Sequence, residues 1–318
     1  MPTAEHPGSM APLARQVQSL RNAGVSMDVL EITGAPKWKY LQTLPRQWKY
    51  IALGKPDLVH AHFGYCGMLA RCQLQKPLVV SFMGDDLLGE PDDDGRITLY
   101  SKVIVQIDRL LARFVDAVIV KSEEMARIVA PVKAHVIPNG VDTERFYPIE
   151  PAVARQRLGW SAGKRYILFT GNPAFPRKGF PLAQAITRYV QHHFDEPVEL
   201  VILWDVLPDH VPLYMNASDV MILPSLFEGS PNVVKEALAC NVPVVSGPVG
   251  DVSFLLDGVE GCEVCPREEA AMGAAVVRVL QTGQRVAGRA ALERKGLDLA
   301  TVAQRILAVY TDVLQRSC

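Results

Sequence analysis

Two glutamates separated by seven residues stand in the C-terminal half of the sequence. Glu228 follows residues 219–225, whose apolar run predicts a buried strand, so it lies at a strand's carboxyl end. Open α/β sheets bind ligands at that edge. Glu236 lies about 6–8 Å further along a helix. This separation does not suit two carboxylates flanking one glycosidic bond. It suits a linear ligand with hydroxyls at both ends, although spacing alone favours two glutamates without a ligand.

The turn between the glutamates predicts a helix start that can hold an anion. Ser230 suits the N-cap, and Pro231 suits the first helical position. The N–H groups around Asn232 and Val233 then lack partners inside the helix and face an anion, helped by the helix dipole. Hydroxyls at both ends with an anion between them match a nucleoside diphosphate sugar, in which the diphosphate joins a hexose and a ribose.

A second strand end in the same half carries two adjacent cations. Residues 165–171 predict a strand, and the loop after it contains Arg177 and Lys178. At this edge of the sheet, both cations could neutralise a diphosphate and the charge of its leaving group. A solvated basic turn is the alternative explanation for so short a motif.

The elements that must position these residues alternate along the chain. Short β-branched runs and amphipathic helical stretches predict two doubly wound α/β units with parallel sheets. We expect an N-terminal unit over residues 1–148, a C-terminal unit over 149–298, and a helix over 299–318 that packs back toward the first unit. The expected strands are residues 26–32, 57–63, 77–83, 116–122, 134–138, 165–171, 198–204, 219–225 and 242–247.

Most of the chain resembles the retaining glycosyltransferases of family 4, also called glycosyl transferases group 1. Residues 214–251 are similar to the nucleotide-sugar signature of that family, including its E-x7-E pair, and residues 135–148 are similar to its interdomain strand and turn. The resemblance implies the GT-B fold, two Rossmann-like domains facing a cleft. It implies transfer of a sugar from a UDP- or GDP-sugar, with retention, to a glycan, lipid-linked or small-molecule acceptor in polysaccharide or glycoconjugate biosynthesis. No metal or other cofactor is expected.

The resemblance also implies roles for single residues. Glu228 would contact the hydroxyls of the donor sugar, and Glu236 those of the ribose. Asn172 stands where the family often has arginine, so phosphate binding is expected to rely on Arg177 and Lys178. The expected catalytic residues are Glu228, His62 and Lys178, and the expected donor-binding residues are Asn172, Arg177, Lys178, Gly229, Ser230, Pro231, Asn232, Val233 and Glu236.

The N-terminal half supplies the expected acceptor side. His60 and His62 share one face of a predicted strand, and the resemblance places His62 at the cleft. An H-x-H pair can bind metal, but the sequence offers no third ligand nearby. Asp85 and Asp86 are expected, with His60, to contact acceptor hydroxyls, and a plain turn is the alternative. Met83 stands where the family usually has histidine.

Two short motifs are typical of metal sites but favour simpler explanations. The D-x-D at 92–94 sits between proline and glycine, which favours a solvated turn. The C-x-x-C at 262–265 has no second pair at zinc spacing. Both motifs therefore leave the expectation of a metal-independent enzyme unchanged.

Composition predicts a soluble cytoplasmic protein. The chain has 318 residues, is 49% hydrophobic and carries a net charge of −1, which gives no reason to expect nucleic acid. Residues 37–50 interleave cations and aromatic residues. They could make a peripheral contact with anionic lipids at the inner membrane face. The favoured alternative is a partly buried helix, interrupted by Pro45, whose lysines snorkel to water.

The start of the sequence differs from the pattern of the family. Residues 1–10 look like the stretch that follows the first strand and glycine-rich loop, so we expect the first strand of the N-terminal unit to be missing. Its loss would expose strand edges. Two further hypotheses are a non-catalytic nucleotide-sugar-binding partner subunit and a GT-B-fold nucleotide-sugar epimerase.

Overall fold

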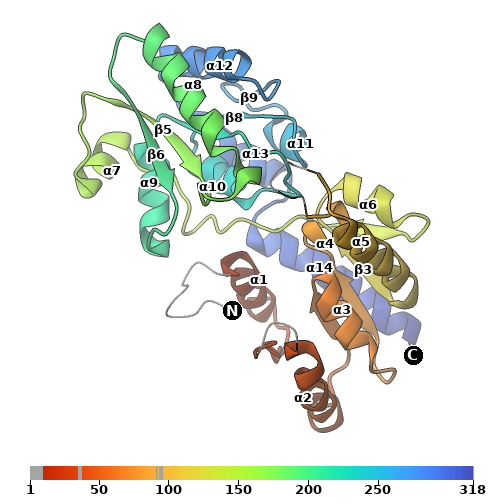
Figure 1. The fold of residues 1–318 in the computed structure, drawn as a ribbon. Helices are drawn as coiled ribbons and strands as arrows, with labels where there is room; N and C mark the ends of the chain where they lie inside the picture. Colours follow the sequence, from red (N-terminus) through yellow and green to blue (C-terminus); the bar gives the residue numbers. More distant parts are fainter. Residues whose placement is uncertain (1–9, 35–37, 91, 93–95, 318) are drawn as a thin grey trace.

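The structure is a computed structural model that describes residues 10–34, 38–90, 92 and 96–317. Within these residues, two parallel sheets follow one another along the chain, each flanked by helices (Figure 1). This arrangement is the pair of doubly wound units predicted from the alternating pattern. Residues 1–9, at the chain start, and 93–94, of the D-x-D motif, lie outside the described residues.

The N-terminal sheet has four parallel strands in the order β1-β2-β3-β4. The middle strands, β2 and β3, are buried along their whole length, because helices cover both faces of the sheet. In the register, Val80 pairs with Val118, which pairs with Ala134. The strands are β1 (Val59–His62), β2 (Leu78–Ser81), β3 (Ala117–Val120) and β4 (Ala134–Val136).

Two helical layers enclose this sheet. Ala70, Leu111 and Met125, from α3, α5 and α6, pack on one face, and Leu20 and Ile306, from α1 and α14, pack on the other. The C-terminal helix thus lies against the N-terminal sheet. The helices of this unit are α1 (Ala11–Asn22), α2 (Lys39–Gly54), α3 (Gly64–Arg71), α4 (Asp85–Leu88), α5 (Leu99–Leu111), η1 (Ala112–Phe114) and α6 (Glu123–Val129), and the C-terminal helix is α14 (Leu299–Ser317).

The strand expected at residues 26–32 does not form. Exposed and partly buried residues alternate along 25–29, as in a strand, and Val25 and Met27 pack against the core on the α14 side. In the described part of the chain, however, no strand pairs with this segment or with the outer edge of β1. A period-two pattern predicts which side chains are buried, but a strand also needs a partner for its backbone groups.

The C-terminal sheet has five parallel strands in the order β6-β5-β7-β8-β9. Its two faces carry separate apolar cores, one around Leu168 and Val244 and the other around Ile167 and Val245. The strands are β5 (Arg165–Thr170), β6 (Val198–Leu203), β7 (Val220–Leu223), β8 (Val244–Ser246) and β9 (Glu263–Val264). The helices are α7 (Pro151–Leu158), η2 (Pro176–Lys178), α8 (Phe180–His193), η3 (Pro208–His210), α9 (Val211–Ala217), α10 (Asn232–Ala239), α11 (Val252–Leu256), α12 (Glu269–Thr282) and α13 (Gly288–Arg294).

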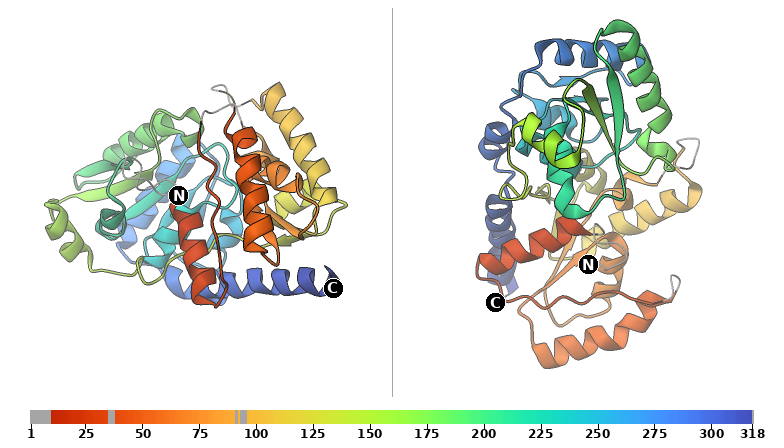
Figure 2. Two further views of the ribbon diagram at one scale, coloured as in Figure 1. Left: turned by 90° about the horizontal axis from the view of Figure 1, so that it is seen from below. Right: turned by 90° about the vertical axis from the view of Figure 1, so that its left-hand side faces the viewer.

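The chain passes between the two units twice, and the two passages are bonded to each other. Val141 N–H donates to Leu297 O at 2.9 Å, and Leu299 N–H donates to Val141 O at 3.2 Å. Gly140 makes this approach possible, because a Cβ there would lie 2.9 Å from the Leu299 Cα. After the second passage, α14 runs back along the N-terminal unit (Figure 2). In the described residues, no helix is both long and apolar enough to cross a bilayer.

Candidate active site

Glu228 and Lys178 meet at the carboxyl ends of two neighbouring strands, β7 and β5. Lys178 Nζ lies 2.6 Å from Glu228 Oε1, and both side chains are largely buried. The loops are fixed to each other, since Leu226 N–H donates to Arg177 O at 2.8 Å. Gly179 has a φ of +72°, and a Cβ there would collide with the carbonyl oxygen of Pro224. Glu228, expected to contact the donor sugar, and Lys178, expected to contact the phosphates, therefore form one ion pair.

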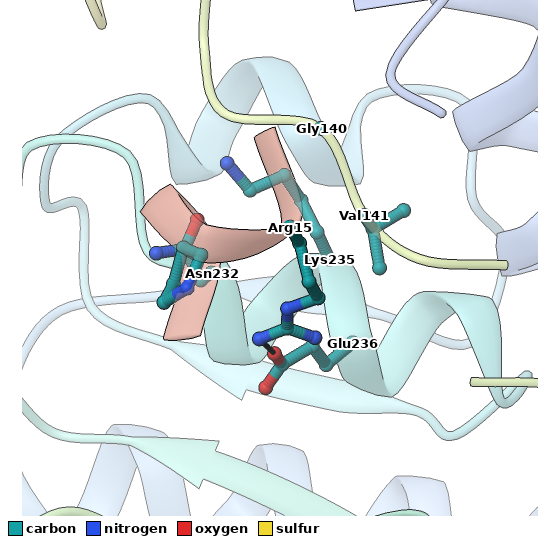
Figure 3. A pocket seen from close by; sticks show the side chains of 7 residues that line it. Arg15, Gly140, Val141, Asn232, Lys235 and Glu236 are labelled. Atoms are coloured by element: carbon teal, nitrogen blue, oxygen red, sulfur yellow. Dashed lines mark hydrogen bonds and ion pairs between the residues drawn. The ribbon is translucent and has the colours of Figure 1, made fainter. Parts of the chain in front are cut away.

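Glu236 lies on the second turn of α10 and pairs with a cation from the other unit. Arg15 of α1 places its guanidinium 3.0 Å from Glu236 Oε1 (Figure 3). Burial raises the pKa of Glu236, and the Arg15 guanidinium acts in the opposite direction. These side chains, with Pro12, Gly140, Val141, Asn232 and Lys235, line a crevice too narrow to admit water.

The helix start between the glutamates differs in detail from the expectation. The N-cap is Pro231 rather than Ser230, and α10 begins at Asn232 without a side-chain cap. The Ser230 hydroxyl is used otherwise, because it accepts a 3.0 Å hydrogen bond from Lys235 Nζ. The first-turn N–H groups of α10, including those of Asn232 and Val233, still have no partner inside the helix. The turn thus keeps its capacity to bind an anion.

Lys235 is a fully buried cation that links the turn to the passage between the units. Besides Ser230, its ammonium donates to Asn139 O at 2.9 Å. Burial lowers the pKa of Lys235 to about 8, and Asp251 opposes that shift. Nearby, Asn232 Oδ1 and both Asp251 carboxylate oxygens are buried without a hydrogen-bond partner. Free buried acceptors suit a ligand that brings hydroxyl donors, as sugars do.

Two contacts bring the N-terminal unit against this turn. Arg177 lies 3.4 Å from Asp85 at the start of α4. A Cβ on Gly229 would lie 3.4 Å from the Gly84 Cα and 3.5 Å from the Met83 carbonyl oxygen. Asp85, expected on the acceptor side, therefore faces Arg177, which was expected on the donor side, and the two units approach to van der Waals distance at Gly229.

The expected donor residue Asn172 is engaged locally. Its side-chain oxygen accepts the N–H of Ala174 at 2.9 Å, which forms an Asx-type turn after β5. This bond fixes the loop that leads to Arg177 and Lys178. The Asn172 amide is thus a turn-forming group that brings no charge to this loop.

The two histidines of β1 have different surroundings, although their rings lie only 4.3 Å apart. His60 is held by Tyr310 Oη at 2.5 Å and Ser81 Oγ at 2.8 Å, so neither ring nitrogen is left for an acceptor. Burial lowers the pKa of His60 to about 3. His62 has a buried Nδ1 without a partner, and burial, His60 and Lys121 together lower its pKa. A neutral imidazole with a free nitrogen can hydrogen-bond a sugar hydroxyl.

The Asp86 carboxylate is hydrogen-bonded to backbone N–H groups and does not face an open site for the sugar acceptor. Its carboxylate accepts the N–H groups of Met83 and Gly84 at 2.9–3.0 Å. Burial raises the pKa of Asp86, and bonds from Gly84, Met83 and Gly64 lower it. The aspartate thus ties the ends of β1 and β2 together, as the plain-turn alternative predicts.

The residues that could hold a metal are dispersed. In the part of the chain that the structure describes, no three His, Cys, Asp or Glu side chains gather into a metal-binding group. The thiol of Cys262 accepts the N–H of Val244 at 3.3 Å, so it belongs to the β8–β9 pairing. Positive groups at this edge of the C-terminal sheet include Arg177, Lys178 and the N-terminus of α10.

Comparisons with known proteins identify the family. The profile described as Glycosyltransferase Family 4 matches residues 12–145, and that described as Glycosyl transferases group 1 matches residues 182–282. The chain belongs to glycosyltransferase family 4. Family 4 membership covers both units, because one match lies in each.

Relatives and solved structures agree with this assignment. The family 4 chain is 29% identical to the glycosyltransferase TuaC of Bacillus subtilis, named for teichuronic acid biosynthesis, over 242 residues. That match covers 70% of this chain and 61% of TuaC, so the chain spans less than two thirds of this relative's length. Sucrose-phosphate synthase from Thermosynechococcus elongatus superposes with a TM-score of 0.76 at 18% identity, covering 96% and 93% of the two chains. Anabaena HepE in complex with UDP superposes with a TM-score of 0.66 at 19% identity, covering 93% and 89%. The likeness confirms the expected GT-B fold.

Sequence reasoning missed three members of this family 4 site: Arg15, Lys235 and Asp251. Lys235 gave one signal, a cation inside the apolar helical run 233–239. Arg15 gave none, because it lies on a helix that ordinary periodicity explains, 221 residues from its partner. Asp251 directly follows a glycine, and aspartate beside glycine is common in turns, so its type and place gave no signal.

Proposed function

We propose that the chain is a retaining glycosyltransferase that moves a sugar from a UDP- or GDP-sugar to a glycan, lipid-linked or small-molecule acceptor. One observation carries the proposal: the Glu228–Lys178 pair lies beside the α10 N-terminus, with Glu236 a helical turn further on. This order of groups matches a hexose, a diphosphate and a ribose. The UDP complex of HepE, which shares the fold, supports a nucleotide ligand.

The site residues have complementary tasks in this proposal. Lys178, Arg177 and the first-turn N–H groups of α10 neutralise the diphosphate as it leaves. Glu228 orients the hexose through its hydroxyls, and Glu236 orients the ribose. His62 donates a hydrogen bond at the sugar from the opposite unit. Attack on the same face of the sugar, with the leaving phosphate as base, accounts for retention without a protein nucleophile.

A substitution at Glu228 tests this function. Glu228→Gln keeps the size of the side chain and removes the charge that holds Lys178. We expect nucleotide binding to persist while transfer or donor hydrolysis falls about 100-fold, since misplacing one such group costs that order in rate. Glu260→Gln, at an exposed position of the C-terminal unit, is the matched control.

A thermal-shift screen with UDP-, GDP- and ADP-sugars identifies the donor for that assay, because a ligand that binds the native state raises the melting temperature. Donor binding without any turnover would favour a non-catalytic subunit. Conversion of the donor to its epimer without an acceptor would favour an epimerase. A melting temperature unchanged by all three donors would contradict nucleotide-sugar binding itself.

A further inference from the structure

The outward face of α5 is apolar where a surface helix is ordinarily polar. Leu99, Val103, Ile107, Leu110 and Phe114 recur every three or four residues from α5 into η1, so they lie on one side of the helix. They are 40–78% exposed. The opposite side of α5 packs into the N-terminal unit through Ser101, Asp108 and Leu111. The helix therefore has one face packed into the unit and a second, apolar face that nothing in the described chain covers.

The helix α2 has a similar outward face. Trp38, Leu41, Trp48 and Leu53 are 58–72% exposed. Leu41 and Trp48 are seven residues apart, so they lie two turns from each other on one side of the helix, and Pro45 stands between them. Two exposed tryptophans on one short element are unusual for a surface that faces only water.

These two helices are joined across α3 into one surface. The rings of Tyr40 on α2 and Tyr65 on α3 have centroids 5.5 Å apart. The hydroxyls of Tyr65 and Tyr100, at the start of α5, lie 2.5 Å apart. Helix α3 contacts both α2 and α5, and Figure 1 shows the three on one flank of the N-terminal unit. We call residues 38–54 and 99–114 together the aromatic-basic face.

The charges on the aromatic-basic face have one sign. Its cations are Lys39, Arg46 and Lys49 on α2, and Lys102, Arg109 and Arg113 on α5 and η1. Within residues 38–54 and 99–114, the single acidic side chain is Asp108, which is fully buried. A second copy of the chain would bring like charges together across a two-fold axis, which opposes self-association through this face.

We propose that the aromatic-basic face docks on a bilayer surface that contains anionic lipids. Apolar side chains enter the boundary between headgroups and acyl chains, tryptophans and tyrosines lie at headgroup level, and cations meet lipid phosphates. The surface takes up the lipid contact considered for residues 37–50, where a partly buried helix was the favoured explanation, and adds α5, a helix that sequence patterning gave no reason to include. Docking holds whether or not the chain transfers a sugar, so it fails or succeeds independently of the proposed function.

Flotation with vesicles tests the proposal. The wild-type chain is expected to float with equimolar phosphatidylcholine and phosphatidylglycerol and to remain unbound with phosphatidylcholine alone. Raising the salt to about 1 M, where the Debye length is about 3 Å, should weaken binding. Val103→Ser combined with Leu110→Ser makes the middle of the apolar face of α5 polar, and Trp48→Ser removes one of the two exposed tryptophans at α2. Each is expected to lower vesicle partitioning at least tenfold.

Two controls separate docking from misfolding and from dimer formation. Phe254→Ser, at a half-exposed position of the C-terminal unit, should bind like the wild type. The melting temperature of each variant should stay close to that of the wild type, because all the sites are exposed. Equal flotation of wild type and both variants would overturn the proposal, as would failure of the wild type to float. Light scattering that shows a wild-type dimer converted to a monomer by the α5 variant would assign the face to a second copy instead.

Discussion

The carboxylates around the cleft differ in how their charge is balanced. Glu228 and Glu236 each face a cation from another loop or helix, and Asp86 is held by backbone N–H groups. Asp108 has neither kind of partner. It lies on the buried side of α5, both its oxygens lack hydrogen bonds, and it packs directly against Gly64. This arrangement disfavours the ionised form of the Asp108 carboxyl and leaves its protonated form unaffected.

The isolation of Asp108 predicts a pH-dependent stability. Burial, followed by the Asp86 charge, raises the pKa of Asp108 to about 7. An unfolded chain ionises this group near pH 4. The folded state therefore loses stability as the pH rises from about 4 to about 7, and the loss persists above that range. Asp108→Asn is expected to raise the melting temperature by a few degrees at pH 8 and to change it little at pH 4, by scanning calorimetry. An equal change at both pH values would contradict this cause.

Residue-level chemistry was predictable where it is local in sequence. The spacing of Glu228 and Glu236, and the cations after β5, could be read directly because each motif lies within one strand–loop–helix segment. Their partners could not be read in the same way. Arg15 reaches Glu236 across 221 residues, and Lys235 reaches Asn139 across 96. No local pattern encodes such pairs, so they follow only from the packing of the two units.

At the scale of elements, the strands of both sheets were predicted except for β9, a two-residue strand. Buried parallel strands such as Val220–Leu223 are continuous apolar runs, which few other structures explain. The strand predicted at residues 26–32 was wrong, because a period-two pattern indicates which side chains are buried and not whether the backbone pairs with another strand. The predicted N-cap of α10 was one residue too early, because the Ser230 hydroxyl accepts a hydrogen bond from Lys235 Nζ and does not cap the helix.

Helix α1 places Arg15 in an ion pair with Glu236. In the proposed function the Glu236 carboxylate accepts hydrogen bonds from the ribose hydroxyls, so Arg15 competes with the ribose for it. Arg15→Gln should therefore strengthen binding of the nucleotide selected by the thermal-shift screen, about two- to fivefold at pH 8.5, as expected for loss of a competing ion pair of up to about 1 kcal/mol. Arg15 also opposes the rise in the pKa of Glu236 that burial causes. Without Arg15, the pKa of Glu236 should be higher, so Glu236 becomes protonated earlier as the pH falls. Nucleotide binding by Arg15→Gln should therefore start to weaken at a higher pH than binding by the wild type, because a protonated Glu236 accepts fewer hydrogen bonds from hydroxyls.

Calorimetric titration of the nucleotide across pH, with Arg15→Gln and the wild type side by side, measures both effects. Arg21→Gln is the matched control on the same helix, since its guanidinium donates only to Met27 O among the described residues. Weaker binding by Arg15→Gln at pH 8.5 would show instead that Arg15 contacts the nucleotide. That result would leave the assignment of Glu236 intact, because the nucleotide would still bind.

At the scale of the whole molecule, the last helix of the chain completes the core of the first unit. Helix α14 buries Val302, Ile306 and Val309 against the face of the sheet that α1 also covers. Its Arg305 donates to Val136 O at 2.7 Å, and its first residue accepts the Ser19 hydroxyl at 2.7 Å. Because α14 begins at Leu299, which is bonded to Val141, its position is tied to both connections between the units.

A substitution at Ile306 tests whether helix α14 stabilises the N-terminal sheet. Ile306→Ala removes a fully buried side chain packed with Leu20, Val79 and Ile119, and we expect a loss of about 3 kcal/mol in the free energy of unfolding. Gln304→Ala, on the exposed side of the same helix, should change it by less than about 0.5 kcal/mol. Urea unfolding followed by circular dichroism measures both. If Ile306→Ala unfolds like Gln304→Ala, then α14 does not hold the sheet in solution, and the N-terminal unit must be stabilised without it. If the loss appears with an unchanged slope against urea, the substitution has changed the stability and not the surface exposed on unfolding.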